Sequence, residues 1–241
     1  MNKAAIIARL KSEMLPLHAI KFLTESSSLD VSLGDIKHAF PANRFPVSAI
    51  HEFMCNKIED VSVTCGFITG LLSFLLESNG FCIWVSDSSS VFTPALKVFN
   101  IEPEKIIFIQ LNKSRDILWA AEEALKCNGL AAVVCEIPEL DFISSRRLQL
   151  AVEKSNVTGF IIRNTPKKLN STACVTRWEV TSAASLFTDD MPGVAFPRWN
   201  VALLRVRNGT PGNWLIEWNK NSFVHIPKIA ELTQEVNRKT G

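Results

Sequence analysis

Residues 49–85 decide the fold, and they have the sequence AIHEFMCNKIEDVSVTCGFITGLLSFLLESNGFCIWV. Residues 49–54 are typical of a strand, residues 61–77 carry apolar side chains nearly all round a helix, and residues 81–85 form a continuous apolar strand. A strand that is apolar on both faces is typical of a parallel sheet covered by helices. This strand, helix and strand unit therefore predicts the first right-handed crossover of an α/β core.

The alternation of helices and strands continues along the chain. Three further helices alternate with three further buried strands, which we expect at 92–99, 106–109, 115–127, 130–135, 142–155 and 159–163. In the last third, apolar and polar side chains alternate as in half-exposed antiparallel strands, at 175–180, 201–206 and 214–218. The predicted fold is α/β, with a mostly parallel sheet, helices on both faces and antiparallel strands added at the C-terminal edge.

The chain is expected to divide into three segments. Residues 1–40 hold an amphipathic helix and a polar linker, and this helix is expected to dock either on its own domain or on another chain. Residues 41–218 form the core domain. Residues 219–241 are polar and charged, with only a weak helical pattern, and are predicted to be a mobile tail.

Composition excludes several classes of protein. With 26 basic and 24 acidic residues, the chain has no large positive field for gripping duplex DNA. No apolar run reaches the roughly 18 residues of a membrane span, and no secretory signal is evident, so we expect an intracellular protein that does not bind membranes. The six cysteines are scattered without metal-ligand spacing, so they are predicted to be buried thiols.

The loop after the first strand lacks the residues of a phosphate site. Such a loop needs glycines and a lysine followed by Ser or Thr, yet the chain has only 10 glycines where average usage gives roughly 17. Lys57 is not followed by a hydroxyl, and Glu59 and Asp60 place negative charge at the helix start. The degenerate positions of a nucleotide site are Lys57, Asp60, Ser62, Thr64 and Glu136.

Glu136 is the best single catalytic candidate, because it ends a buried strand where nucleotide enzymes hold a magnesium ligand. Without a phosphate loop it has no substrate to act on. The four histidines are dispersed and predict no hydrolase triad. We therefore assign no catalytic residue, cofactor or metal, and keep a cryptic ATPase as the enzymatic alternative.

Basic side chains mark the candidate contacts with DNA or a protein partner. Arg146 and Arg147 are expected to point outward from the helix at 142–155. Two alternatives stay open: they form part of a solvated face, or they contact DNA phosphate or an acidic partner. Arg205 and Arg207, on an antiparallel strand, are the other two candidates.

The order of elements and three stretches resemble the ImuA family, whose members are RecA-fold proteins found beside error-prone polymerases. The stretches are 39–53 (AFPANRFPVSAIHEF), 116–125 (DILWAAEEAL) and 146–153 (RRLQLAVE). The resemblance implies a RecA-like core. Ala42, Asn43, Arg44 and Ser48 stand where the family often has glycine, so we expect no ATP hydrolysis.

The resemblance also implies a role and partners. It implies an accessory subunit of a translesion-synthesis complex in the DNA-damage (SOS) response, in the bacterial cytoplasm and at the nucleoid during repair. The expected partners are an ImuB-like Y-family polymerase homologue and an error-prone polymerase alpha subunit, with RecA, single-stranded DNA and further copies of the chain as additional candidates. The alternative is a SulA-like inhibitor of cell division that binds FtsZ.

Overall fold

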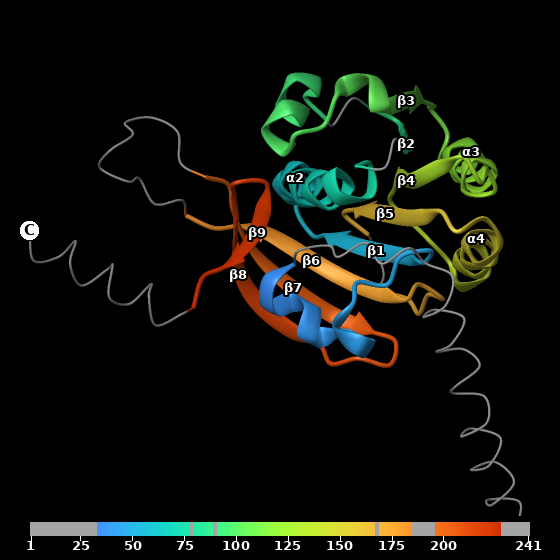
Figure 1. Ribbon diagram of the computed structural model, residues 1–241. Helices are drawn as coiled ribbons and strands as arrows, with labels where there is room; N and C mark the ends of the chain where they lie inside the picture. The colour runs from blue at the N-terminus through green and yellow to red at the C-terminus, as the bar shows by residue number, and fades with distance from the viewer. Residues whose placement is uncertain (1–32, 78–79, 89–90, 167–168, 185–195, 228–241) are drawn as a thin grey trace, which may run out of the picture.

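The computed structural model describes residues 33–77, 80–88, 91–166, 169–184 and 196–227. The amphipathic helix predicted near the N-terminus lies outside these residues. The fold is built on one sheet of nine strands in the order β3-β2-β4-β5-β1-β6-β7-β8-β9 (Figure 1). The strands are β1 Ile50–Cys55, β2 Phe81–Ser86, β3 Ile106–Gln110, β4 Leu130–Ile137, β5 Thr158–Asn164, β6 Thr176–Ser182, β7 Arg198–Val206, β8 Gly212–Asn219 and β9 Ser222–His225.

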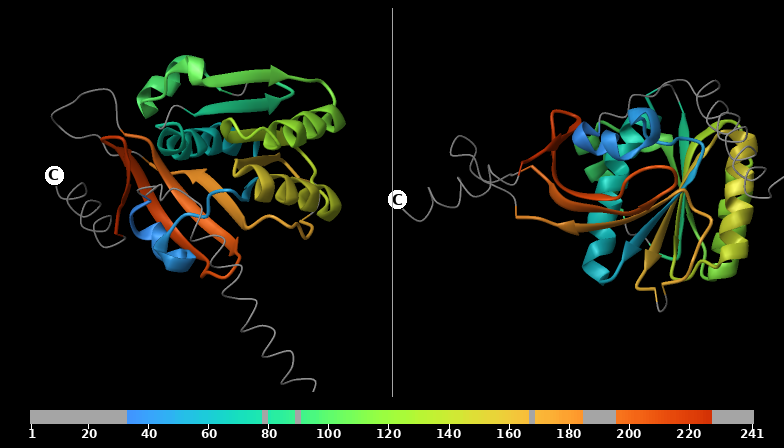
Figure 2. Two further views of the ribbon diagram at one scale, coloured as in Figure 1. Left: turned by 45° about the vertical axis from the view of Figure 1, so that its right-hand side comes forward. Right: turned by 90° about the horizontal axis from the view of Figure 1, so that it is seen from below.

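Helices cover both faces of the sheet. Helix α2 (Ile58–Leu75) lies on one face, and α3 (Ser114–Leu125) and α4 (Phe142–Ser155) lie on the other (Figures 1 and 2). The short 3-10 segments are η1 Gly34–Ala39, η2 Pro41–Asn43, η3 Thr93–Phe99 and η4 Pro103–Lys105. The predicted α/β fold, with its antiparallel C-terminal edge, is confirmed, although residues 93–99 form a 3-10 helix rather than an α-helix.

Strand β6 differs from its prediction. It pairs in parallel with β1 and antiparallel with β7, so it lies inside the sheet at the junction of the two halves. The expected antiparallel pairing of the strand at 175–180 is therefore confirmed with β7, but the expectation that this strand is half-exposed is wrong. Most of β6 is buried, including Arg177, whose charge is neutralised by a carboxylate on β1.

The sheet also continues into the stretch that we assigned to a mobile tail. Strand β9 pairs antiparallel with β8, and Phe223 on β9 is buried. A Cβ added to Gly70 on α2 would lie 2.6 Å from Cζ of Phe223, so this glycine permits the close approach of the helix to the ring. The structure thus assigns residues 222–225 to the core and describes the chain as far as residue 227.

The two faces of the sheet bury different side chains. The face under α2 is rich in aromatic rings and includes Trp178 and Trp199, whereas the face under α3 and α4 is mainly aliphatic. Helix α2 has the length and hydropathy of a membrane span by composition alone. Because two thirds of it is buried against the sheet, it is explained as a core helix.

Candidate functional site

The connection between β1 and α2 lies where an open parallel sheet binds its ligands. Two residues, Asn56 and Lys57, join the strand to the helix. Asp60 is 8% exposed, and its Oδ2 accepts a hydrogen bond of 3.0 Å from the backbone N–H of Lys57. An acidic side chain of this chain therefore occupies the helix N-terminus that would otherwise attract a phosphate.

The surroundings of Cys55, the last residue of β1, are negative. The pKa of the Cys55 thiol is raised to about 11, mainly by burial and also by the carboxylates of Asp60, Glu136 and Glu179, while its bond to Thr64 lowers it. Glu179 in turn accepts a hydrogen bond of 2.7 Å from Nδ2 of Asn56. Three carboxylates thus surround the point where a nucleotide's phosphates would need positive charge.

The two hydroxyls predicted at this site do not converge. Ser62 is exposed on α2, whereas Thr64 is fully buried and accepts a 3.4 Å hydrogen bond from Sγ of Cys55. Glu136 is 2% exposed, and its Oε1 accepts a hydrogen bond of 2.6 Å from the indole N–H of Trp84 on β2. Among the described residues, no group of three or more His, Cys, Asp and Glu side chains is arranged to hold a metal ion.

A buried ion cluster on the other face joins β1, β5 and β6. Glu52 is fully buried, and its carboxylate contacts Arg163 at 3.0 Å and Arg177 at 2.8 Å. Thr172, in the loop between β5 and β6, donates a further hydrogen bond of 2.7 Å to the same carboxylate. Arg163 also contacts the half-exposed Glu139 at 2.9 Å. The cluster ties the β5–β6 loop to the centre of the sheet.

Arg205 and Arg207 support the same loop. Arg205 donates to Thr172 O at 3.1 Å and Cys174 O at 3.0 Å, and Arg207 donates to Ala173 O at 3.4 Å. Arg205 is half-buried and Arg207 is exposed. The structure thus gives both residues a role inside the fold, and their contact with DNA or a partner stays a prediction.

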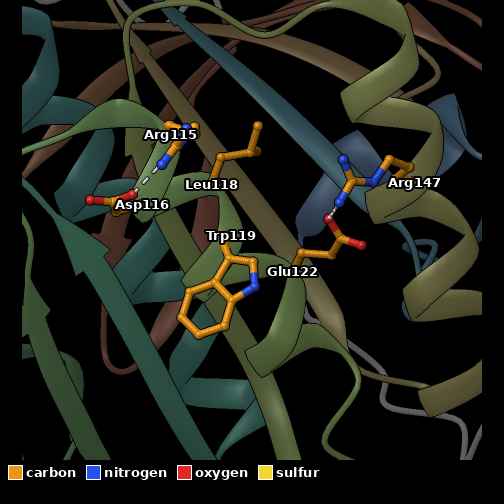
Figure 3. Close-up of a pocket in the computed structure, with 6 residues that line it drawn as sticks. All are labelled: Arg115, Asp116, Leu118, Trp119, Glu122 and Arg147. Atoms are coloured by element: carbon orange, nitrogen blue, oxygen red, sulfur yellow. Dashed lines mark hydrogen bonds and ion pairs between the residues drawn. The ribbon is translucent and has the colours of Figure 1, made fainter.

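Of the other predicted arginine pair, Arg147 lines a groove between α3 and α4 (Figure 3). Arg147 forms an ion pair with Glu122 of α3 across this groove, and Arg146 lies 4.0 Å from Glu153 on its own helix. Trp119, on α3, lines the groove and is 63% exposed. The groove therefore combines exposed aromatic surface with arginine, the residue types enriched in protein interfaces.

No model of a known protein family matches the chain. Among curated proteins, Protein ImuA from two strains of Caulobacter vibrioides is 29% identical over 201 residues, which cover 78% of this chain and 82% of the relative. The chain is therefore similar to ImuA over most of its length. The resemblance inferred from three stretches of sequence is therefore confirmed over most of the chain.

Sequence reasoning missed two features of this chain, the buried ion cluster and the exposed Trp119. A signal for the cluster was present, because Glu52 and Arg163 each stand within or beside apolar strands. Charges in such positions are paired when they are buried. Trp119 gave no comparable signal, since an aromatic residue on an amphipathic helix is as readily part of the core.

Proposed function

We propose that the chain is a non-catalytic, RecA-like accessory subunit of an error-prone translesion DNA synthesis complex in the DNA-damage (SOS) response of a bacterium. Its direct partner in this proposal is an ImuB-like Y-family polymerase homologue, and an error-prone polymerase alpha subunit completes the complex. The similarity to Protein ImuA supports the broader part of the proposal, a DNA-damage accessory protein acting in the cytoplasm.

The observation that carries the non-catalytic part is the β1–α2 connection. A phosphate loop of the Walker type spans about eight residues, whose backbone N–H groups surround the phosphates. Here Asn56 and Lys57 alone join strand to helix, and Asp60 already accepts the N–H of Lys57. The carboxylates of Glu136 and Glu179 add negative charge nearby. This arrangement favours a binding role over nucleotide hydrolysis.

Isothermal titration calorimetry with Mg-ATP tests the non-catalytic part. We expect no binding heat at millimolar nucleotide, with a RecA-type ATPase as the positive control under the same buffer conditions. Saturable heat, together with phosphate release that Glu136→Gln abolishes, would refute it.

Co-purification tests the partner. The tagged chain and the ImuB-like homologue from the same bacterium are expressed together, and the tagged chain is expected to retain the homologue through a salt wash. The control is an unrelated tagged protein of similar size. Loss of the homologue in the first wash, with both proteins folded, would contradict the proposal.

A further inference from the structure

The groove between α3 and α4 has no role in the fold described above. We propose that it is the docking site for an acidic segment of the partner polymerase homologue, which inserts a large apolar side chain against Trp119. This inference rests on the proposed function, and it adds the surface and the chemistry of the partner segment.

The groove consists of two adjoining hollows of about 410 Å³ and about 350 Å³. They share Glu122 and Arg147, so they lie next to each other along the two helices. The side chains that line it come from α3 and α4 and from the residues at their ends: Arg115, Asp116, Leu118, Trp119, Glu122, Lys126, Arg147, Leu150, Ala151, Lys154 and Ser155.

Trp119 supplies the apolar contact. Of the six tryptophans in the chain, Trp119 is the exposed one, because four are buried and Trp214 is half-buried. Leu150, 42% exposed, lines the other end of the groove. Exposed tryptophan beside arginine is the composition of an interface hot spot, where one side chain contributes a large share of the binding energy.

The charges along the groove favour an acidic occupant. Four cations line it against two carboxylates, Asp116 and Glu122. Both carboxylates are already paired, since Asp116 lies 3.8 Å from Arg115, and Glu122 contacts Arg147 and lies 3.4 Å from Lys126. Lys126 also pairs with Glu123 at the rim.

Two cations line the ends of the groove, Arg115, which among the described residues is paired only with Asp116 at 3.8 Å, and Lys154. The side chain of Arg115 is 93% exposed, and Lys154 makes no ion pair within the part of the chain that the structure describes. Charge complementarity of this kind steers association and selects the partner.

The chain's own terminal segments do not fit this charge. Residues 3–15 contain Lys3, Arg9 and Lys11 against Glu13, and residues 228–241 contain three basic and two acidic side chains. Both segments are net basic and would be repelled by the cations of the groove. An acidic segment of another protein is the complementary occupant.

The first test removes the aromatic contact. We expect Trp119→Ala to weaken binding to the polymerase homologue at least tenfold in calorimetry. The matched control is Phe92→Ala, which removes a similarly exposed aromatic ring beside η3, on the opposite side of the sheet. Both positions are exposed, so both variants are expected to unfold at the wild-type temperature.

The second test reverses charge. The double variant Arg115→Glu/Lys154→Glu is expected to weaken binding at least tenfold at low salt, and the difference from wild type shrinks as salt is raised. Glutamate is well tolerated at position 115, because it lies in the first turn of α3. The control Lys37→Glu/Lys97→Glu changes the net charge equally at exposed positions of η1 and η3 and is expected to bind as wild type does.

The outcomes separate the two proposals. If the wild-type chain binds the homologue and the groove variants bind equally well, the docking site is wrong and the proposed function stands. If the groove variants and the control variants weaken binding equally, the effect comes from net charge or from any change of the exposed surface. The proposed docking site is wrong in that case too. If the wild-type chain does not bind the homologue, the proposed function itself fails, and this inference fails with it.

Discussion

Glu52→Gln is the substitution whose effect the structure predicts most sharply. The change keeps the size of the side chain and removes the charge that neutralises Arg163 and Arg177. All three charged groups are at least nine-tenths buried, and removing one partner of such a buried pair costs about 3–5 kcal/mol. Because domains are stable by only about 5–15 kcal/mol, this is a large share of the free energy of unfolding.

Urea unfolding followed by tryptophan fluorescence measures this loss. With a slope of about 3 kcal/mol per molar urea, the unfolding midpoint is expected to fall by roughly 1–1.7 M. The matched control is Glu139→Gln, which removes the other carboxylate of Arg163. The Glu139 side chain is 47% exposed, so solvent screens this pair and the expected loss is below about 1 kcal/mol. Equal losses in the two variants would refute the reasoning.

Three further predictions concern stability. The pKa of His51 is lowered to about 3 by burial, against the smaller opposing effect of its bond to Pro46 O, so the ring is neutral in the fold. The unfolded chain takes up this proton below about pH 6.5. The stability that depends on the neutral ring is therefore full above about pH 6.5 and falls towards pH 3 by up to about 1.4 kcal/mol per pH unit. In His51→Gln this part of the pH dependence should vanish. If the urea midpoints of the variant and of wild type fall in parallel as the pH is lowered, the prediction is wrong. Phe223→Ala should cost about 3–5 kcal/mol, while Val224→Ala, at an exposed neighbour, should cost less than about 1; equal urea midpoints would mean that β9 is not part of the core. Asp141→Ala removes the cap that accepts the N–H of Ser144 at 2.6 Å and should cost about 1 kcal/mol in thermal unfolding, whereas Asp141→Ser should retain most of the stability.

The parallel half of the sheet could be predicted because its strands are buried on both faces. Residues 81–85 and 130–135 are continuous apolar runs, and each matches an observed strand. A cap such as Asp141 can be recognised in the same way, since a short acidic side chain before a helix has a local role that needs no tertiary contact.

Strand β6 was misassigned for a physical reason. Arg177 and Glu179 alternate with apolar residues, as they would in a strand with one wet face. Arg177 is nevertheless buried, because Glu52 on the neighbouring strand neutralises it. Which strand lies next to β6 depends on the order of strands in the sheet. The alternation of residues along a single strand does not reveal that order.

The features of the candidate site depend even more on tertiary structure. The groove exists because α3 and α4 lie side by side, and residues 119 and 147 are 28 positions apart in sequence. Strand β9 was overlooked because it is only four residues long and its one buried ring, Phe223, follows a run of four polar residues at 219–222. By contrast, the missing phosphate loop was evident in the sequence, since its motif is local and continuous.

The central claim is that the chain is a non-catalytic subunit that binds a polymerase homologue. Measuring the mass of the complex in the absence of nucleotide tests this claim most directly. The purified chain and the cognate ImuB-like homologue are mixed at micromolar concentration and measured by size-exclusion chromatography with light scattering. We predict one peak whose mass contains both proteins, unchanged when Mg-ATP is added. Two separate peaks at the masses of the free proteins, or a complex that forms only with ATP, would contradict the account.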